Sequence, residues 1–425
     1  MTITGTNKHF DVELNLVGSK SESNRVLMIG YYGDFEPQIT NLSDSDDTKL
    51  LQSLLREIIS IDRGQDTVLK KDVNGCYIVD CDNAGTVFRF LLSALALHSR
   101  ESWILTGNER MKHRPVGELV DTLRAMGSDI EYMENEGFPP LKIGLSYPRC
   151  STSQFSVDIS RSSQFASSLL LAIPAIRRAT FLRLTGDLSS LPYIDMTIAN
   201  MCHFSAYAVR QGREIYVSDS GYINTEFTVE SDWSAASYWY EIVAFSEGGR
   251  VKMKNLRLDS FQGDRATADI FESFGVQTTA ENGCIVAVQK AKAKALHYDF
   301  SNTPDLFPAV AATCVGMQVE ASFTGLRNLS IKESDRVKAM TDELSKIGVK
   351  YDRIGDDSLI LHPLNSLPLF EKDNPIVFDT YGDHRIAMAL APLAMKIGAV
   401  EIKNPEVVSK SYPNYWNDLL KVFSL

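Results

Sequence analysis

The stretch CYIVDCDNAGTVFRFLLSALAL, from Cys76 to Leu97, contains two different patterns. CYIVDC alternates apolar and polar residues as a half-buried strand does, whereas LLSALAL is apolar almost all round, as in a buried helix. Between them stands DNAGT, and Arg89 follows Gly85 by one helical turn. The stretch therefore predicts a strand that leads into the N-terminus of a buried helix.

Glycine and small hydrogen-bonding residues at such a helix start favour an anion site. Free backbone N–H groups and the positive end of the helix dipole point in the same direction there. Asn83, Gly85 and Thr86 have this composition. An ordinary N-cap followed by an arginine that extends to solvent is the simpler interpretation of this stretch taken alone.

The composition is that of a globular protein. The chain has 425 residues, 44% hydrophobic and 23% charged, so large cores and two or three domains are expected. It has no run of about 18 apolar residues, and its start, MTITGTNKHFDVEL, lacks the basic and then apolar order of a signal peptide. We expect a soluble, cytoplasmic protein with no membrane partner.

Cysteine spacing and net charge exclude further classes. No C-x-x-C spacing occurs and the cysteines lie in apolar stretches, so reduced core thiols are expected and structural zinc is not. The cysteines are Cys76, Cys81, Cys150, Cys202, Cys284 and Cys314. The formal net charge of −11 argues against a nucleic-acid partner. An anion site in so acidic a chain must gather its cations in one place.

Two kinds of helix recur along the chain. The first begins with a polar cap and is otherwise apolar, which predicts a buried helix, and the second is amphipathic, which predicts one exposed face. The predicted buried helices cover 21–32, 83–97, 162–174, 231–245, 303–314 and 382–395. The predicted amphipathic helices cover 44–58, 114–127, 192–205, 263–275, 334–348 and 412–423.

Strand-like segments separate these helices, so the pattern indicates a supersecondary unit repeated six times. The segments include 10–17, 75–80, 102–107, 180–186, 249–255 and 400–404. Each unit is longer than the repeat of a typical solenoid, which favours two compact groups of three units over one rod. We expect the join near residue 228.

The helix starts and nearby loops share polar and cationic residues. Taken singly, Asp305 suits any helix N-terminus, Lys332 and Glu333 suit a solvated face, and His384 suits a core or a cap. If the units point their helix starts at one cleft between the domains, the result is a pocket for more than one phosphate or carboxylate. The residues at these starts are Lys20, Arg25, Arg89, Arg114, Ser162, Ser163, Gln164, Tyr193, Asp305, Lys332, Glu333, Arg336, Asp383, His384, Arg385 and Lys410.

Standard nucleotide and metal motifs are absent. VGSKSESNR differs from a P-loop because Ser19 separates Gly18 from Lys20, and Glu13 stands where the first glycine is required. No G-x-G-x-x-G, H-E-x-x-H or G-x-S-x-G occurs. We therefore expect no ATP, NAD or zinc chemistry.

At these residues the chain resembles the 5-enolpyruvylshikimate-3-phosphate synthase family of enolpyruvyltransferases. The resemblance runs nearly end to end and is carried by GSKSESNR, NAGTVFR, LTGNERMKHRPVGELVDTLRAMG, SSQFASSLLLA, PYIDMT, DWSAASY, PDLFPAVA, LRNLSIKESDRV and DHRIAMALA. LTGNERM with the following RP, and KESDR together with DHR, are the most specific of these.

The resemblance implies an α+β fold, an inside-out α/β barrel. It implies two domains, each of three βαβαββ units around buried helices, with six repeats in all. The N-terminal domain would cover 18–228 and hold shikimate-3-phosphate. The C-terminal domain would cover 1–17 plus 229–425 and hold phosphoenolpyruvate and the catalytic residues, with the active site in the cleft between the domains.

The family reaction moves the enolpyruvyl group of phosphoenolpyruvate to the 5-hydroxyl of shikimate-3-phosphate through a tetrahedral intermediate, without metal or cofactor. By resemblance, shikimate-3-phosphate is bound by Lys20, Ser21, Arg25, Ser162, Ser163, Gln164, Ser190, Tyr193, Asp305, Asn328 and Lys332. Phosphoenolpyruvate is bound by Lys20, Asn83, Gly85, Arg114, Gln164, Arg336, Arg385 and Lys410, and the supporting residues are Thr86, Arg89, Asp383 and His384. The family also implies a monomer.

Addition to an enol ether needs one group that protonates carbon and another that accepts the hydroxyl proton. We expect Glu333 to be the acid and Asp305 the base, with Lys20 assisting at the bridging oxygen. Charge accumulates on a carboxylate and a departing phosphate, which favours arginine as the partner.

The chain departs from the family pattern at four positions, and two other functions stay open. Phe90 stands where proline is usual, Leu191 where many members have lysine, Ser330 where many have arginine, and Val17 where proline is common. One alternative is the sister transferase that acts on UDP-N-acetylglucosamine, although NERMKHRP lacks its usual cysteine. The other is a non-catalytic phosphometabolite-binding protein of the same fold.

Overall fold

The computed structural model describes residues 1–6, 8–145, 152–291 and 295–424. These residues fold into two units, each with its own hydrophobic core. The N-terminal unit consists of Lys20–Leu42 and Asp46–Val229. The C-terminal unit consists of Met1–Ser19, Ser43–Ser45 and Glu230–Leu425, so it contains both ends of the chain. Among the described residues, no helix has the length and apolar character needed to cross a bilayer.

Among the described residues, five four-stranded sheets share one pairing pattern. The first and second strands are parallel, the fourth strand pairs antiparallel with the second, and the third strand lies at the edge beside the fourth. In the N-terminal unit the sheets are β4 (Tyr77–Asp80), β5 (Trp103–Thr106), β6 (Ile130–Tyr132) and β7 (Leu141–Ile143), and β8 (Gln154–Asp158), β9 (Thr180–Thr185), β10 (Ala208–Gln211) and β11 (Glu214–Val217).

The C-terminal unit holds the other three sheets of this kind. The first is β2 (Asp11–Leu14), β13 (Arg250–Lys254), β14 (Val276–Glu281) and β15 (Cys284–Gln289), and the second is β16 (Leu296–Asp299), β17 (Ala321–Thr324), β18 (Lys350–Ile354) and β19 (Ser358–His362). The third is β20 (Ile376–Phe378), β21 (Val400–Ile402), β22 (Phe423–Ser424) and β1 (Thr2–Thr6). The N-terminal strand β1 thus completes a sheet whose other strands come from the end of the chain.

Helices connect the strands in a regular order. The helices that precede the second strand of each sheet are α3 (Gly85–Leu97), α5 (Gln164–Ala172), α7 (Trp233–Phe245), α9 (Phe307–Gly316), and α11 (His384–Leu390) with α12 (Ala394–Ile397). The helices that follow the second strand are α4 (Gly117–Ala125), α6 (Leu191–His203), α8 (Thr267–Glu272), α10 (Arg336–Ser345) and α13 (Tyr415–Leu419). The remaining α-helices are α1 (Lys20–Gly33) and α2 (Asp46–Asp62).

Short 3-10 helices lead into or out of these elements. They are η1 (Met111–His113), η2 (Ile173–Ile176), η3 (Gly263–Ala266), η4 (Phe300–Asn302), η5 (Pro304–Leu306), η6 (Arg327–Ile331), η7 (Ala391–Leu393) and η8 (Pro405–Lys410). Three of them, η5, η6 and η8, precede α9, α10 and α13 and carry predicted site residues discussed below.

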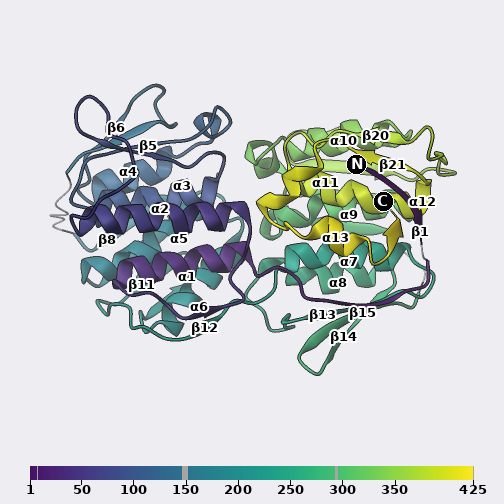
Figure 1. Ribbon diagram of the computed structural model, residues 1–425, viewed down its shortest axis with the longest axis horizontal. Helices are drawn as coiled ribbons and strands as arrows, with labels where there is room; N and C mark the ends of the chain where they lie inside the picture. Colours follow the sequence, from purple (N-terminus) through teal and green to yellow (C-terminus); the bar gives the residue numbers. More distant parts are fainter. Residues whose placement is uncertain (7, 146–151, 292–294, 425) are drawn as a thin grey trace. The chain divides into compact units, whose positions relative to one another are not determined.

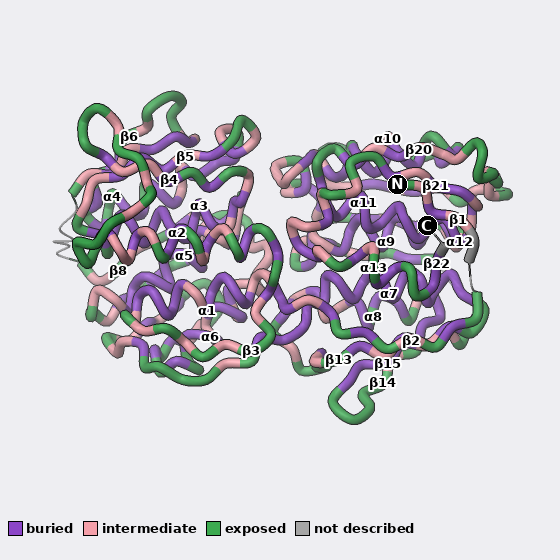
Figure 2. The backbone as a smooth tube through the Cα atoms, in the orientation of Figure 1, coloured by how far each residue is buried: buried purple, intermediate pink, exposed green. Residues whose placement is uncertain are grey.

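Buried helices occupy the middle of each unit (Figure 1). In the C-terminal unit α9 packs against both α7 and α11, and every residue of these three helices is buried (Figure 2). A helix that is apolar on all sides is stable only when other elements surround it, and the sheets provide that cover. In the N-terminal unit α5 packs against α1, α3 and α6 in the same way.

Strand β13 alternates between the core and solvent. In β13, Val251 and Met253 are buried, while Lys252 and Lys254 both form ion pairs with Glu13 of β2, with nitrogen–oxygen distances of 3.1 and 2.5 Å. The period of two is what a sheet with one buried face requires. The interiors of the units therefore come from helices and from one face of each sheet.

The structure changes several details of the sequence predictions. The sixth predicted unit has only a two-stranded parallel sheet among the described residues, β3 (Ile39–Thr40) with β12 (Phe227–Thr228), in place of four strands. The predicted helix 303–314 begins as η5 and becomes α9 at Phe307, and 412–423 shortens to α13. Pro304, Pro308 and Pro413 lack the N–H that a continuous helix needs.

The cysteine prediction needs one correction. Four of the described cysteines are buried, namely Cys76, Cys81, Cys284 and Cys314. Cys202 is exposed, because it lies near the C-terminal end of the amphipathic helix α6, on its outer side. Cys150 lies outside the described residues.

The core of the C-terminal unit contains one acid without a partner. Glu241 on α7 is 0% exposed, and neither carboxyl oxygen has a hydrogen-bond partner among the described residues. Burial raises the pKa of Glu241 well above its ordinary value of 4.5. The folded chain therefore holds this carboxyl protonated at pH values where the unfolded chain releases the proton, so stability falls as pH rises above 4.5.

Glu241→Met should remove this pH dependence, because methionine has a similar volume and no titratable group. We expect the variant to gain more free energy of unfolding over the parent at pH 8 than at pH 5, by roughly 2 to 4 kcal/mol. Urea unfolding at both pH values measures the gain. Glu272→Gln, at an exposed position of α8, is the control. An equal gain from Glu241→Met at both pH values would contradict the argument.

Candidate active site

Arg336 is the centre of a buried ionic cluster in the C-terminal unit. Arg336 is the first residue of α10, and its side chain is 1% exposed. Nη1 donates to Asp305 Oδ1 at 2.6 Å, Nη2 to Glu333 Oε2 at 2.8 Å and Nε to Asp383 Oδ2 at 2.8 Å. Burial alone would lower the pKa of Arg336, but Asp383, Glu333 and Asp305 raise it, so the guanidinium stays charged.

Asp305, on η5, collects cations from two further elements. Arg385 Nη2 of α11 donates to its Oδ2 at 2.8 Å, and Lys332 Nζ lies 3.9 Å from its Oδ1. Burial would raise the pKa of this carboxyl, but Arg385, Lys332 and Arg336 hold it well below its usual range. Asp305 is thus an ionised carboxylate whose basicity depends on its cations.

Asp383 links this cluster to the helix framework. It is 0% exposed and is the N-cap of α11, where its Oδ1 accepts from the backbone N–H of Arg385 at 3.0 Å. Its Oδ2 accepts from Ser334 Oγ at 3.0 Å as well as from Arg336. An acidic cap satisfies free N–H groups and the helix dipole at once, so Asp383 fixes Arg336 and the start of α11 together.

Arg25 is the corresponding buried cation of the N-terminal unit. It lies on α1, is 1% exposed, and its hydrogen bonds go to neutral oxygens. Nε donates to Thr197 Oγ1 at 2.7 Å, and Nη2 donates to Ser167 Oγ at 3.2 Å and to the Tyr193 carbonyl at 3.1 Å. Burial lowers the pKa of Arg25 to about 10, so it is still charged at neutral pH.

Arg89 joins the start of α3 to the start of α5. Nη1 donates to Gln164 Oε1 at 2.8 Å and to the Gly85 carbonyl at 3.4 Å, and Nη2 donates to the Pro115 carbonyl at 3.0 Å. Gln164 Nε2 in turn donates to Thr86 Oγ1 at 2.8 Å. The side chain of Arg89 therefore braces the loop predicted to bind an anion, and it does not extend to solvent as the simpler interpretation would have it.

The lack of a side chain at Gly85 also makes room for Arg114. A Cβ atom at this position would lie 2.6 Å from both Cζ and Nη1 of Arg114. Arg114 Nη1 donates to the Asn83 carbonyl at 3.2 Å and is 5% exposed. The missing side chain thus lets a guanidinium approach the first turn of α3.

Lys20 pairs with a carboxylate that the sequence analysis did not single out. Its Nζ lies 3.1 Å from Oδ2 of Asp47, the second residue of α2, and the side chains are 12% and 7% exposed. Lys20 is the first residue of α1, so this ion pair ties the starts of α1 and α2.

The other predicted site residues also lie at or near the ends of helices. Ser21 is one turn before Arg25 and its carbonyl accepts from Arg25 Nη1 at 2.7 Å. Ser162 and Ser163 precede α5, Ser190 is the N-cap of α6 with a φ of 55°, Asn328 lies on η6, Lys410 ends η8 and His384 begins α11. By the unit that contains them, the predicted residues form an N-terminal group and a C-terminal group.

Comparison with known proteins supports one family. The model of the family described as EPSP synthase (3-phosphoshikimate 1-carboxyvinyltransferase) matches residues 5–419. A 3-phosphoshikimate 1-carboxyvinyltransferase of Bacteroides fragilis strain YCH46 is 38% identical over 415 residues, covering 96% of this chain and 94% of the relative. One from Sulfurovum sp. strain NBC37-1 is 36% identical and covers 98% of each chain.

The chain belongs to the EPSP synthase family. A solved EPSP synthase from Acinetobacter baumannii has the same mixed α/β fold, with a TM-score of 0.76 at 22% identity, covering 100% of this chain and 99% of that one.

One departure from the family pattern touches the site. Phe90 is 1% exposed, and its ring centroid is 5.5 Å from Arg25 Cζ, while the Tyr193 ring centroid is 5.9 Å from the same atom. An arginine close to the faces of aromatic rings is attracted to them. Leu191 is the first residue of α6, Ser330 lies on η6 with its Oγ donating to the Arg327 carbonyl, and Val17 packs against the core of the C-terminal unit.

Sequence reasoning missed the residues that hold the family's charged groups in place. Asp47, Ser167 and Thr197 were not singled out, although their partners Lys20 and Arg25 were. A local signal existed for Thr197, a polar residue one turn after Tyr193 whose Oγ1 donates to the Tyr193 carbonyl at 2.7 Å. No comparable local signal marks Ser167.

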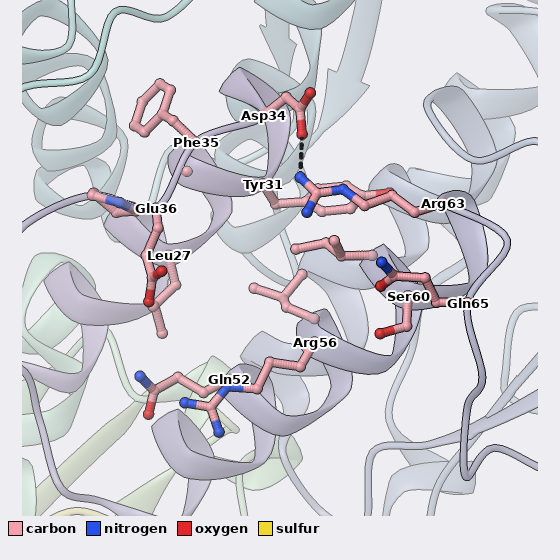
Figure 3. Close-up of a pocket in the computed structure, with 14 residues that line it drawn as sticks. Leu27, Tyr31, Asp34, Phe35, Glu36, Gln52, Arg56, Ser60, Arg63 and Gln65 are labelled. Carbon is pink, nitrogen blue, oxygen red and sulfur yellow. Dashed lines mark hydrogen bonds and ion pairs between the residues drawn. The ribbon is translucent and has the colours of Figure 1, made fainter.

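A pocket of about 490 Å³ lies elsewhere in the N-terminal unit (Figure 3). It is formed by the second half of α1, the following loop and the outer side of α2, and it includes the Asp34–Arg63 ion pair at 2.9 Å. None of its lining residues is a predicted site residue. Across residues 1–6, 8–145, 152–291 and 295–424, no group of three His, Cys, Asp or Glu side chains is placed to bind a metal ion.

Asp383→Asn should destabilise the fold, because it leaves Arg336 with less compensation in a buried place and weakens the cap of α11. We expect a loss of about 3 kcal/mol in the free energy of unfolding, the scale of breaking a buried ion pair. Denaturant unfolding at pH 7 measures it. Asp269→Asn is the control, since its ion pair with Arg265 is exposed and should change stability by less than about 1 kcal/mol. Losses of equal size in both variants would refute the role given to Asp383.

Proposed function

We propose that this chain transfers the enolpyruvyl group of phosphoenolpyruvate to the 5-hydroxyl of shikimate-3-phosphate and releases phosphate. The match to the family over nearly the whole chain gives the reaction. The observation that carries the proposal is that two carboxylates, Asp305 and Glu333, share Arg336 within 2.6 and 2.8 Å, beside Arg385 and Lys332. A transfer that needs an acid, a base and anion-binding cations finds all of them in this cluster.

The N-terminal group supplies most of the proposed binding site for shikimate-3-phosphate. Arg25 gives most of its hydrogen bonds to hydroxyl and carbonyl oxygens, so its charge is available to a phosphate. The residues we assign to this substrate are Lys20, Ser21, Arg25, Ser162, Ser163, Gln164, Ser190 and Tyr193, with Asp305, Asn328 and Lys332 from the C-terminal group. Both groups serve one reaction in this proposal.

Phosphoenolpyruvate carries a phosphate and a carboxylate, and arginine binds both in bidentate fashion. We assign its binding to Lys20, Asn83, Gly85, Arg114, Gln164, Arg336, Arg385 and Lys410. Thr86, Arg89, Asp383 and His384 support these residues. Arg336 and Arg385 are paired with carboxylates of the chain itself, so in this proposal the donor must compete with Asp305 and Glu333 for them.

This competition gives the two carboxylates their proposed roles. In the addition step the 5-hydroxyl oxygen bonds to C2 of the donor, the hydroxyl proton passes to Asp305 and a proton from Glu333 adds to the methylene carbon. In the elimination step the bond between C2 and the bridging oxygen breaks with assistance from Lys20, the methyl carbon returns a proton to Glu333, and the departing phosphate takes up the proton held by Asp305. Donor anions that engage Arg336 and Arg385 weaken the field at Asp305, which raises its basicity when the donor is bound.

We also propose the finer features that the family implies. Each unit is a domain of three βαβαββ units, an inside-out α/β barrel, the β3–β12 unit being reduced in its sheet. The enzyme is a cytoplasmic monomer and needs neither metal nor cofactor. The sister transferase acting on UDP-N-acetylglucosamine and a non-catalytic binding protein are disfavoured by the names of the matched relatives and by the presence of both carboxylates.

Phosphate release tests the reaction directly. We expect release from phosphoenolpyruvate with shikimate-3-phosphate and none with UDP-N-acetylglucosamine under the same conditions. Release only with the nucleotide sugar would change the acceptor and keep the enolpyruvyl transfer. No release with either acceptor, from folded protein that binds shikimate-3-phosphate, would support the binding protein.

Asp305→Asn and Glu333→Gln should each lower kcat at least about a hundredfold, the scale of general acid–base contributions. Each variant keeps the size of the side chain and loses the titrating group. Steady-state turnover measures kcat, and calorimetric binding of shikimate-3-phosphate checks the site. Asp299→Asn, at an exposed position on the preceding strand, is the control and should leave turnover unchanged. Near-normal turnover in either test variant would remove that residue from its role.

A further inference from the structure

A buried carboxylate on α10 binds the turn that leads into α11. Glu343 is 0% exposed and lies two helical turns after Arg336. Its Oε2 accepts from the backbone N–H of Asp379 at 2.9 Å, and its Oε1 accepts from the hydroxyl of Tyr381 at 2.8 Å. Lys346, one turn further along α10, donates to the same Oε2 and balances the charge. Both oxygens of this buried acid are therefore hydrogen-bonded, as its burial requires.

The turn that this carboxylate binds has an unusual backbone. Tyr381 has a φ of 53°, in the left-handed region that residues other than glycine rarely adopt, and Gly382 follows with a φ of 68°. A residue with a side chain keeps such a conformation only when its surroundings impose it. Here Asp379 Oδ1 accepts from the backbone N–H of Tyr381 at 2.9 Å, and the carboxylate on α10 holds both residues from outside the turn.

The residues that follow the turn belong to the ionic cluster. Asp383 closes the turn, because its backbone N–H donates to the Thr380 carbonyl at 2.8 Å. Its side chain caps α11 and accepts from Arg336 Nε at 2.8 Å. Arg385, two residues later, donates to Asp305 Oδ2 at 2.8 Å. A displacement of the turn would therefore disturb the contacts of both arginines.

Helix α10 holds the start of α11 at two points. Arg336, at the N-terminal end of α10, binds the side chain of Asp383, and Glu343, two turns later, binds the turn before it. The helix fixes the separation of these two points. One attachment alone would leave the start of α11 free to pivot, whereas two attachments set both its place and its direction.

We propose that Glu343 is a positioning residue of the transfer reaction, which acts by holding the turn that places Asp383 and Arg385. The inference rests on the proposed function, because it gives Arg336 and Arg385 to phosphoenolpyruvate. In the described part of the chain Glu343 contacts the turn and not the reacting groups. Its loss should weaken binding of the donor more than it slows the chemical step, because the proposed acid and base are kept.

The experiment compares the parent with Glu343→Met, which has a similar volume and no acceptor for the turn. We expect the KM for phosphoenolpyruvate to rise by roughly tenfold or more, the scale of a displaced binding group, and kcat to fall less. Steady-state turnover at saturating shikimate-3-phosphate measures both constants. Glu343→Gln keeps one acceptor oxygen, so it should restore part of the lost affinity.

Asp342→Asn is the matched control. Asp342 is the neighbouring residue of α10, and its ion pair with Lys338 lies at the surface, so the KM for phosphoenolpyruvate should stay at the parent value. A purely structural role for Glu343 would lower the folded fraction, which reduces kcat and leaves KM unchanged. That result in Glu343→Met overturns the proposal, and so does an equal rise in KM in Asp342→Asn.

Tyr381→Phe tests the same inference if Glu343→Met fails to fold. Tyr381 is 41% exposed, so the loss of its hydroxyl should leave the fold intact. We expect the KM for phosphoenolpyruvate to rise by roughly threefold to tenfold, the scale of one hydrogen bond. An unchanged KM in the folded variant overturns the proposal. Inactivity of the parent with shikimate-3-phosphate overturns the proposed function instead, so the two failures can be told apart.

Discussion

The site depends on one buried guanidinium, that of Arg336, which binds three carboxylates from different places in the sequence. A charge removed from water is tolerated only when its partners are close and fully hydrogen-bonded. Asp305, Glu333 and Asp383 meet that condition, and through them η5, the loop before α10 and the start of α11 are held in one arrangement. The sheets surround the helices, but this ionic cluster fixes where three helix starts lie.

The two units stabilise a buried arginine in different ways. In the N-terminal unit Arg25 is held by hydroxyls, carbonyls and two aromatic rings, which orient it without neutralising it. In the C-terminal unit Arg336 and Arg385 are held by carboxylates that neutralise them. The first arrangement favours an anion that binds whenever it is present. The second arrangement favours an anion only if the anion replaces an internal carboxylate at the arginine. The displaced carboxylate then becomes more basic, because it has lost its cation.

Local sequence patterns predicted most helices, because the apolar residues of a helix such as α3 themselves indicate that it is buried. The helix predicted at 83–97 was confirmed as Gly85–Leu97. Partners distant in sequence were not predictable in this way. Arg25 meets Ser167 and Thr197 across 142 and 172 positions, and β1 joins β21 and β22 from the opposite end of the chain. Neither pairing leaves a periodic signal. The sixth sheet and α13 were overestimated: among the described residues β3 pairs only with β12, and α13 begins only at Tyr415, after Pro413.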